Sequence, residues 1–212
     1  MTSRQAVETN ITRKIVGHYA FQPRDIAALQ TQIESQLSAT YRQVIAQQLR
    51  LYSCQKLATG PDATSLKWIR GKAKDDAQSI AATYLKELTN KVSSLRKESP
   101  KGNRFFYLKN LEIWSTARDK HKIPSIGLNT ATAARAYAQD RFIRENKITG
   151  RFAPVGPPPV CIKCVRIFAK GALTWVECRK PQNFLPAHVS CPHTRSALVI
   201  KPIPCNELTW TG

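Results

Sequence analysis

The sequence predicts an α+β protein with a mostly helical N-terminal region, residues 1–150, and a small β-rich zinc-stapled C-terminal lobe, residues 151–212. Three observations lead to this prediction. Apolar residues recur at helical spacing through most of the first 150 positions. After residue 159 they occur in short β-prone runs separated by glycine and proline. Five of the six cysteines fall in the last quarter of the chain.

Four helices are predicted in the N-terminal region. The first begins at Pro23, because proline suits the first turn of a helix, has apolar positions up to residue 52, and is ended by the Thr-Gly-Pro-Asp sequence of residues 59–62. The second carries apolar residues from position 73 to 95 and stops at the Ser-Pro-Lys-Gly sequence of residues 99–102. A shorter third helix covers 103–121, Pro124 interrupts the chain, and a fourth helix covers 129–146.

A proline-rich connection separates the two predicted parts. Residues 150–159 include three consecutive prolines, Pro157 to Pro159, which cannot be helical and favour an extended, stiff segment. Beyond them, residues 165–168, 173–176 and 197–200 form β-prone runs. A lobe of about 60 residues with few large apolar side chains has a marginal core, so a bound metal would stabilise it.

The composition restricts the classes of partner. The chain has 212 residues and carries 33 Lys and Arg against 14 Asp and Glu, a formal charge of +19. Such a charge favours nucleic acid, a membrane surface or an acidic protein as partner, and it does not specify a fold. No apolar stretch approaches the ~18 residues of a membrane span, and residues 1–14 are polar. We therefore expect a soluble protein in a reducing compartment, without membrane contact.

The cysteines and histidines near the C-terminus have the spacing of metal ligands. Cys161 and Cys164 form a C-x-x-C pair, which places two thiolates on one turn, and His188 with Cys191 makes the best second pair. The predicted site is Cys₃His zinc. Cys178 and His193 are alternative ligands. Two other interpretations compete with a zinc site: buried thiols that bind no metal, and thiols with a redox or catalytic role. Four protein ligands leave no position for an activated water, which argues against hydrolytic zinc chemistry.

These residues resemble the C-terminal pattern of the minor head protein family of tailed phages, the phage Mu type with an F-like head-morphogenesis domain. The similarity covers about residues 125–203. It consists of a Thr-, Ala- and Arg-rich helix at 128–137, an extended segment, the C-x-x-C pair, a P-x-H-x-x-C-x-H element at 186–193 and a β-prone run at 198–202. The chain differs from the pattern at Ser190, Pro192 and the three prolines before the pair.

The resemblance implies a structural virion protein, made in the host cytoplasm and located in the head or at the head–tail junction. Portal protein, major capsid protein or both would be its partners, in an oligomeric assembly, without enzymatic activity. The competing hypothesis is an intracellular, sequence-independent nucleic-acid-binding protein with a zinc ribbon-like module. A zinc-dependent nuclease is a third hypothesis. The chain lacks the phosphate-binding glycine motifs, the G-x-S-x-G and H-E-x-x-H motifs and a carboxylate cluster, so we expect no enzyme.

A basic segment supports contact with DNA. Eleven Lys and Arg residues fall between positions 67 and 109, and binding through such a surface would be non-specific and would weaken steeply with salt. A solvated basic face or an acidic protein partner would explain the same charges. Aromatic residues lie among them, and we expect most of these rings to pack in a core or an interface. The candidate nucleic-acid contacts are Lys67, Arg70, Lys72, Lys74, Lys101 and Arg104.

Overall fold

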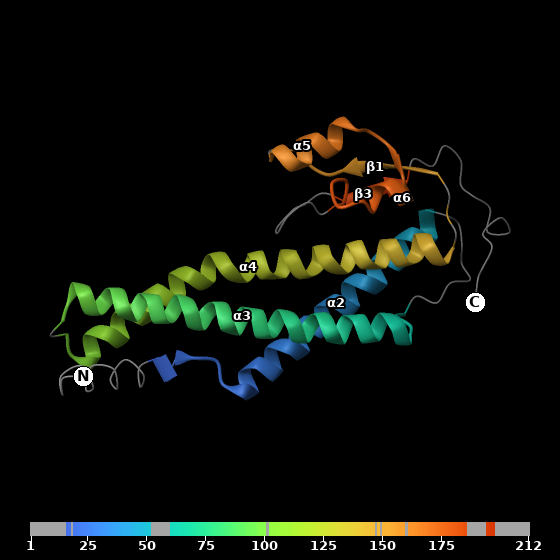
Figure 1. The fold of residues 1–212 in the computed structure, drawn as a ribbon. Coiled ribbons are helices and arrows are strands. Elements are labelled where there is room, and N and C mark those ends of the chain that lie inside the picture. The colour runs from blue at the N-terminus through green and yellow to red at the C-terminus, as the bar shows by residue number, and fades with distance from the viewer. Residues whose placement is uncertain are drawn as a thin grey trace. The chain divides into compact units, whose positions relative to one another are not determined.

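The computed structural model describes residues 16–17, 19–51, 60–100, 102–146, 148, 150–159, 161–185 and 194–197 (Figure 1). Predictions that concern Lys101, His188, Cys191 and His193 lie outside these residues. The described part is mostly helical and contains one small sheet, so the coarse α+β prediction is confirmed. None of the described helices is both long and apolar enough to cross a membrane.

Three long helices make up most of the described chain (Figure 1): α2 at Pro23–Leu51, α3 at Ala63–Glu98 and α4 at Arg104–Glu145. The chain divides into two compact units, and each of these helices has residues in both. Unit 1 consists of Met1–Glu34 and Arg70–Pro124, and unit 2 consists of Ser35–Ile69 and Ser125–Gly212. The predicted connection at 150–159 therefore lies inside unit 2.

The helix starts follow from local hydrogen bonding. Asp62 caps α3 by accepting a hydrogen bond from the Ser65 N–H at 2.8 Å, and Asn103 caps α4 through the Phe106 N–H at 2.9 Å. At the start of α2, Asp25 accepts a bond from the Gln22 N–H at 2.9 Å. The predicted start at Pro23 and the predicted stop after Glu98 are confirmed.

The prediction of separate helices before and after Pro124 was wrong. A single helix of 42 residues, α4, continues through Pro124. An internal proline removes one backbone hydrogen bond and costs about 3 kcal/mol. The segments on both sides bury apolar side chains, with Leu111 before the proline and Ala134 and Ala138 after it each fully buried. This packing outweighs the local cost of the proline.

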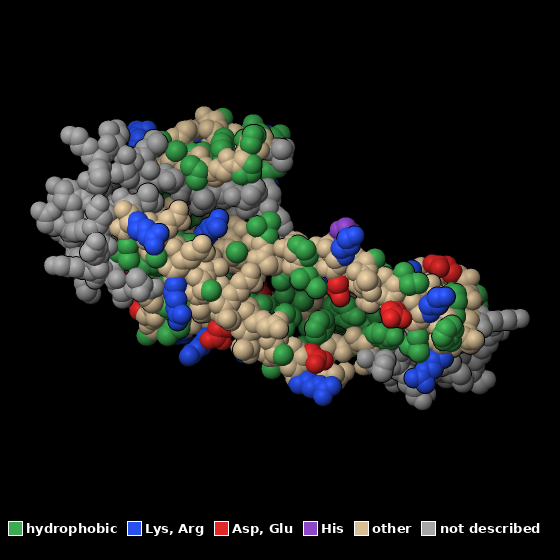
Figure 2. Space-filling model, turned by 180° about the vertical axis from the view of Figure 1, so that it is seen from behind, with side chains coloured by type: hydrophobic (Ala, Val, Ile, Leu, Met, Phe, Trp, Pro, Cys, Tyr) green, Lys and Arg blue, Asp and Glu red, His purple; other side chains and the backbone are tan. Residues whose placement is uncertain are grey.

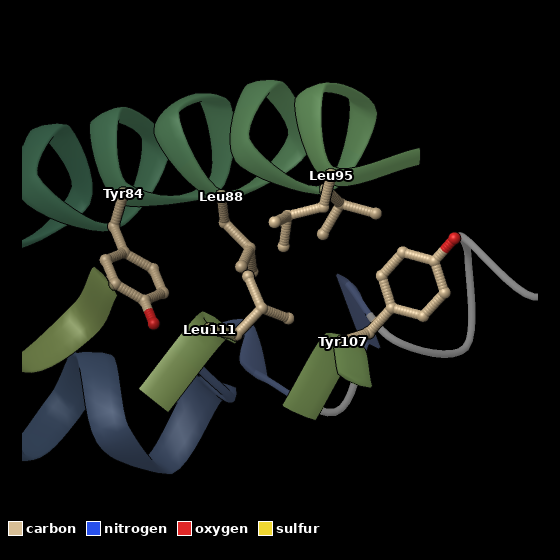
Figure 3. Close-up of a cluster of buried hydrophobic side chains, with 6 residues drawn as sticks. Tyr84, Leu88, Leu95, Tyr107 and Leu111 are labelled. Carbon is tan, nitrogen blue, oxygen red and sulfur yellow. The ribbon is translucent and has the colours of Figure 1, made fainter. Parts of the chain in front are cut away.

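The core of unit 1 lies between α3 and α4 (Figure 3). Leu88 and Leu95 extend from α3 toward Leu111 and Tyr107 of α4, and all four are buried. Tyr84 completes the row and contacts the rings of Phe21 and Trp114 at centroid distances of 5.1 and 5.9 Å. The spacing of these α3 positions is that of one helix face, as the sequence predicted.

In unit 2 the three helices meet through aromatic rings. Trp68 of α3 stacks flat on Tyr137 of α4, with a centroid distance of 3.9 Å and an interplanar angle of 2°. Tyr41 of α2 lies 6.3 Å from Tyr137 and accepts a hydrogen bond from the Ser65 hydroxyl at 3.1 Å. These contacts confirm, for Trp68, the expectation of a packed ring.

The C-terminal lobe of unit 2 contains a three-stranded antiparallel sheet in the order β2-β1-β3. The strands are β1 at Arg151–Val155, β2 at Leu173–Thr174 and β3 at Thr194–Ala197, and two short helices lie between β1 and β3: α5 at Ile162–Ala169 and α6 at Trp175–Cys178. Phe152, in the central strand, is buried and pairs with both neighbours.

The prediction of a strand was wrong for residues 165–168 and half right for 173–176, where Leu173 and Thr174 form β2. Residues 165–168 belong to α5, and Trp175 and Val176 belong to α6. Short apolar runs do not distinguish a strand from a helix turn. Here the N-cap hydrogen bonds favour the helices. Cys161 caps α5, and Thr174 forms a capping box with Glu177 at the start of α6.

Candidate metal centre and basic surface

The C-x-x-C pair lies on the first turn of α5. Cys161 is the N-cap residue, and its sulfur accepts a hydrogen bond from the Cys164 N–H at 3.3 Å. A helix N-terminus and a backbone N–H donor both favour negative charge on a cysteine sulfur. Thiolates are the form in which cysteines bind zinc, so this turn suits half of a tetrahedral site.

A small apolar cluster surrounds the pair. Cys164 is fully buried, Ile167 and Leu185 are buried beside it, and Cys161 packs against the cluster while remaining partly exposed. Leu185 is the last described residue before the Pro186–His193 element that would supply the other predicted ligands. The chain therefore reaches the cysteine pair directly before that element.

The remaining predicted ligands are distributed between described and undescribed parts of the chain. Cys178 is buried at the end of α6, and its thiol lies 3.7 Å from the carbonyl oxygen of Leu173. Within the described ranges, no three His, Cys, Asp or Glu residues are close enough together to hold a metal ion. His188, Cys191 and His193 are outside those ranges, so the predicted four-ligand site stays a prediction.

The candidate nucleic-acid contacts fall into two groups. Arg70 pairs with Glu34 at 3.3 Å, and Lys72 pairs with Asp76. Lys67, Lys74 and Arg104 are exposed, and the part of the chain that the structure describes places no carboxylate against them. Other exposed cations of α3 in unit 1 share this state, namely Lys86 and Lys97. The second group is the one available for phosphate contact.

Most aromatic rings of the basic segment pack against other rings of the protein. Trp114 lies against Tyr84, and Phe106 makes an edge contact with Tyr107 at 5.5 Å. Phe105 differs, because it is 72% exposed and follows Arg104 directly. Base stacking on Phe106, Tyr107 or Trp114 would require these ring contacts to break, so the surface favours backbone contact over stacking.

The sequence did not predict one polar centre of unit 2, which is formed around Asp140. Asp140 of α4 accepts a hydrogen bond from Trp175 Nε1 at 2.9 Å and pairs with Arg144 at 2.9 Å and Arg179 at 3.3 Å. It thereby connects α4 to α6 of the lobe. The spacing of Asp140 and Arg144 within one helix indicated their pair, but no local pattern indicated Trp175 or Arg179 as partners.

Comparison of the chain with models of protein families, with curated proteins and with solved structures found no match.

Proposed function

We propose that the chain is a structural virion protein of a tailed phage, a minor head or head–tail junction component. The observation that supports the proposal is the order of elements in unit 2. A long helix containing residues 128–137 leads to the extended strand β1, then to the cysteine pair at the start of α5, and after residues 186–193 to β3, which pairs with β1. The resemblance at the sequence level has the same order up to residue 193, and its last element, the β-prone run at 198–202, lies outside the described residues.

We infer that Cys161, Cys164, His188 and Cys191 hold a structural zinc ion, with Cys178 and His193 as alternative ligands. The first two residues fit this role because they lie on one turn, beside backbone N–H groups and a buried apolar cluster. Zinc would supply the lobe with a four-point crosslink. The described part of that cluster contains few large side chains, so the crosslink would contribute much of the stability of the lobe.

In the proposed function the basic surface contacts packaged DNA. Exposed cations without carboxylate partners among the described residues, Lys74, Lys86, Lys97 and Arg104, would neutralise phosphates without reading sequence. The partner proteins would be the portal protein, the major capsid protein or both, in an oligomeric assembly inside the virion.

Quantitative mass spectrometry of purified particles from the source tests the proposal. A fixed number of copies in each particle, from a handful to a few dozen, is the expected result for a portal-proximal or interior component. The copy number should survive washing of the particles in high salt, because particle proteins are held by more than surface charge. Absence of the chain from particles, together with abundance in infected cells, would overturn the proposal.

The same exposed cations favour the second candidate, a sequence-independent nucleic-acid-binding protein acting inside the cell. This candidate predicts that the purified monomer binds duplex DNA and that its affinity falls by orders of magnitude as salt rises. It also predicts no stable incorporation into particles. The particle measurement therefore distinguishes the two candidates.

A further inference from the structure

The solvent side of α5 is divided into two parallel stripes of different chemistry. An apolar stripe contains Ile162, which is 67% exposed, and Val165, which is 46% exposed. Ala169 extends this stripe by another turn. The adjacent stripe is basic and consists of Lys163, Arg166 and Lys170, which are also exposed. Residues three and four positions apart share a helix face, so each stripe is continuous.

The opposite side of α5 fixes this orientation. Cys164 and Ile167 are buried there, against Leu185. Turning the helix to bury Ile162 and Val165 would expose Cys164 and Ile167 instead. The apolar stripe therefore lies on the surface of the lobe, and Figure 2 shows hydrophobic side chains exposed on the described part of the lobe.

The basic stripe has no compensating negative charge in the described part of unit 2. Neither Lys163 nor Arg166 has a carboxylate partner there, and Lys170 donates to the neutral Asn183 side chain at 2.6 Å. The described carboxylates of unit 2 are engaged elsewhere. Asp62 and Glu145 pair with Arg141, Asp140 pairs with Arg144 and Arg179, and Glu177 caps α6.

We propose that the outer face of α5 binds an acidic amphipathic segment of a partner protein, one that presents an apolar ridge beside a row of carboxylates. Burial of Ile162 and Val165 would drive the association, and carboxylates opposite Lys163 and Arg166 would fix its register. Binding at this surface is a property beyond the proposed function, and it does not depend on whether the chain belongs to a particle.

Neither nucleic acid nor a membrane fits both stripes. Phosphates would neutralise the basic stripe but would leave Ile162 and Val165 in water. A lipid surface needs a larger apolar area than two large side chains provide, since membrane binding of such helices scales with the apolar area inserted. A protein segment with both chemistries satisfies both stripes together.

The test uses the full-length protein and a labelled helical peptide of about 15 residues, long enough for a stable helix when bound. The peptide carries leucines on one face and glutamates beside them, and fluorescence anisotropy measures its dissociation constant. A second peptide replaces each glutamate by glutamine, which leaves the protein unchanged. We expect at least about tenfold weaker binding of the glutamine peptide, and a similar loss for the K163E/R166E double variant.

Variants of the apolar stripe and matched controls complete the experiment. Ile162→Ser with Val165→Ser should weaken binding about tenfold or more, whereas Val176→Ser, on α6 and 76% exposed, and Lys180→Glu should leave it unchanged. Circular dichroism confirms that each variant is folded. The proposal is overturned if the glutamate peptide does not bind, or binds equally with and without the α5 substitutions. It is also overturned if these substitutions abolish binding only to duplex DNA or to phosphatidylserine vesicles.

Discussion

Trp175 donates a hydrogen bond from its indole Nε1 to Asp140 Oδ1 at 2.9 Å, across 35 positions of the sequence. The same indole makes an edge contact with the ring of Phe152 at 4.9 Å. One side chain therefore joins the end of α4, the short helix α6 and the central strand of the sheet. Trp175 therefore connects the described lobe to α4, beside the ion pair of Arg179 with Asp140.

Removal of the indole N–H tests this connection. Trp175→Phe keeps a ring against Phe152 but loses the donor, and we expect a loss of about 1–2 kcal/mol in unfolding free energy, measured by urea denaturation. In the Asp140→Asn background the same change should cost less, because the acceptor is then uncharged. Additive effects of the two substitutions would contradict a direct interaction between the two side chains.

The core of unit 1 predicts a large difference between two leucines of α3. Leu88 is fully buried against Leu111, whereas Leu85 is 43% exposed. Leu88→Ala should lower the unfolding free energy by about 2–5 kcal/mol, while Leu85→Ala should change it by about 0.5 kcal/mol or less. Thermal and urea unfolding of the two variants provide the comparison. Equal effects would show that α3 packs through another face.

Glu87 predicts a pH-dependent contribution to stability. Burial alone would raise the pKa of Glu87, but hydrogen bonds and charge from Arg118 and Lys122 outweigh it and hold the pKa below the ordinary 4.5. The contribution is therefore present above pH 4.5 and is lost as the pH falls through the lower folded-state value. Glu87→Gln should destabilise the protein at pH 7 by about 1–2 kcal/mol, measured by urea unfolding.

The difference between wild type and Glu87→Gln should shrink in acid and disappear once Glu87 is protonated. Glu112→Gln provides the control, because Glu112 is exposed and forms no ion pair with the described residues. The Glu112→Gln variant should unfold like wild type both at pH 7 and in acid. A deficit of Glu87→Gln that stays constant down to acid pH would contradict the ion-pair explanation.

Substitution of the cysteine pair tests the proposed zinc. Cys161→Ser with Cys164→Ser should abolish zinc binding, measured by elemental analysis of the purified protein, and should expose the chain beyond residue 160 to protease. The helical circular dichroism should remain, because α2, α3 and α4 contain most of the helical residues. Cys54→Ser, outside the proposed ligand set, should retain the metal. Unchanged protease resistance of the lobe would count against a structural site.

The basic surface predicts unequal effects of two neighbouring lysines. Lys74 is exposed without a carboxylate partner in the described chain, while Lys72 pairs with Asp76. If DNA binds α3, Lys74→Gln should lower the affinity and reduce the slope of log affinity against log salt by about one. Lys72→Gln should have the smaller effect. Filter binding over a range of salt concentrations measures both.

The long helices were predictable because their signals are local. Apolar spacing gave the buried face of α3, and Pro23 gave the start of α2. The continuity of α4 through Pro124 was not predictable, since it depends on packing between distant segments that overrides a local preference. The sequence also indicated the turn of Cys161 and Cys164 as a pair. It did not indicate that α5 begins there. It also did not indicate that Trp175 reaches Asp140, because a contact between distant positions has no fixed spacing in the sequence.

Both compact units are built from separate stretches of the chain. Unit 1 joins Met1–Glu34 with Arg70–Pro124, and unit 2 joins Ser35–Ile69 with Ser125–Gly212, so α2, α3 and α4 each cross from one unit to the other. No single cut in the gene separates them. A contiguous segment of the gene that encodes all of unit 2, including the C-terminal lobe, therefore also encodes residues 70–124 of unit 1. Inheritance of unit 2 by recombination therefore requires inheritance of nearly the entire helical region.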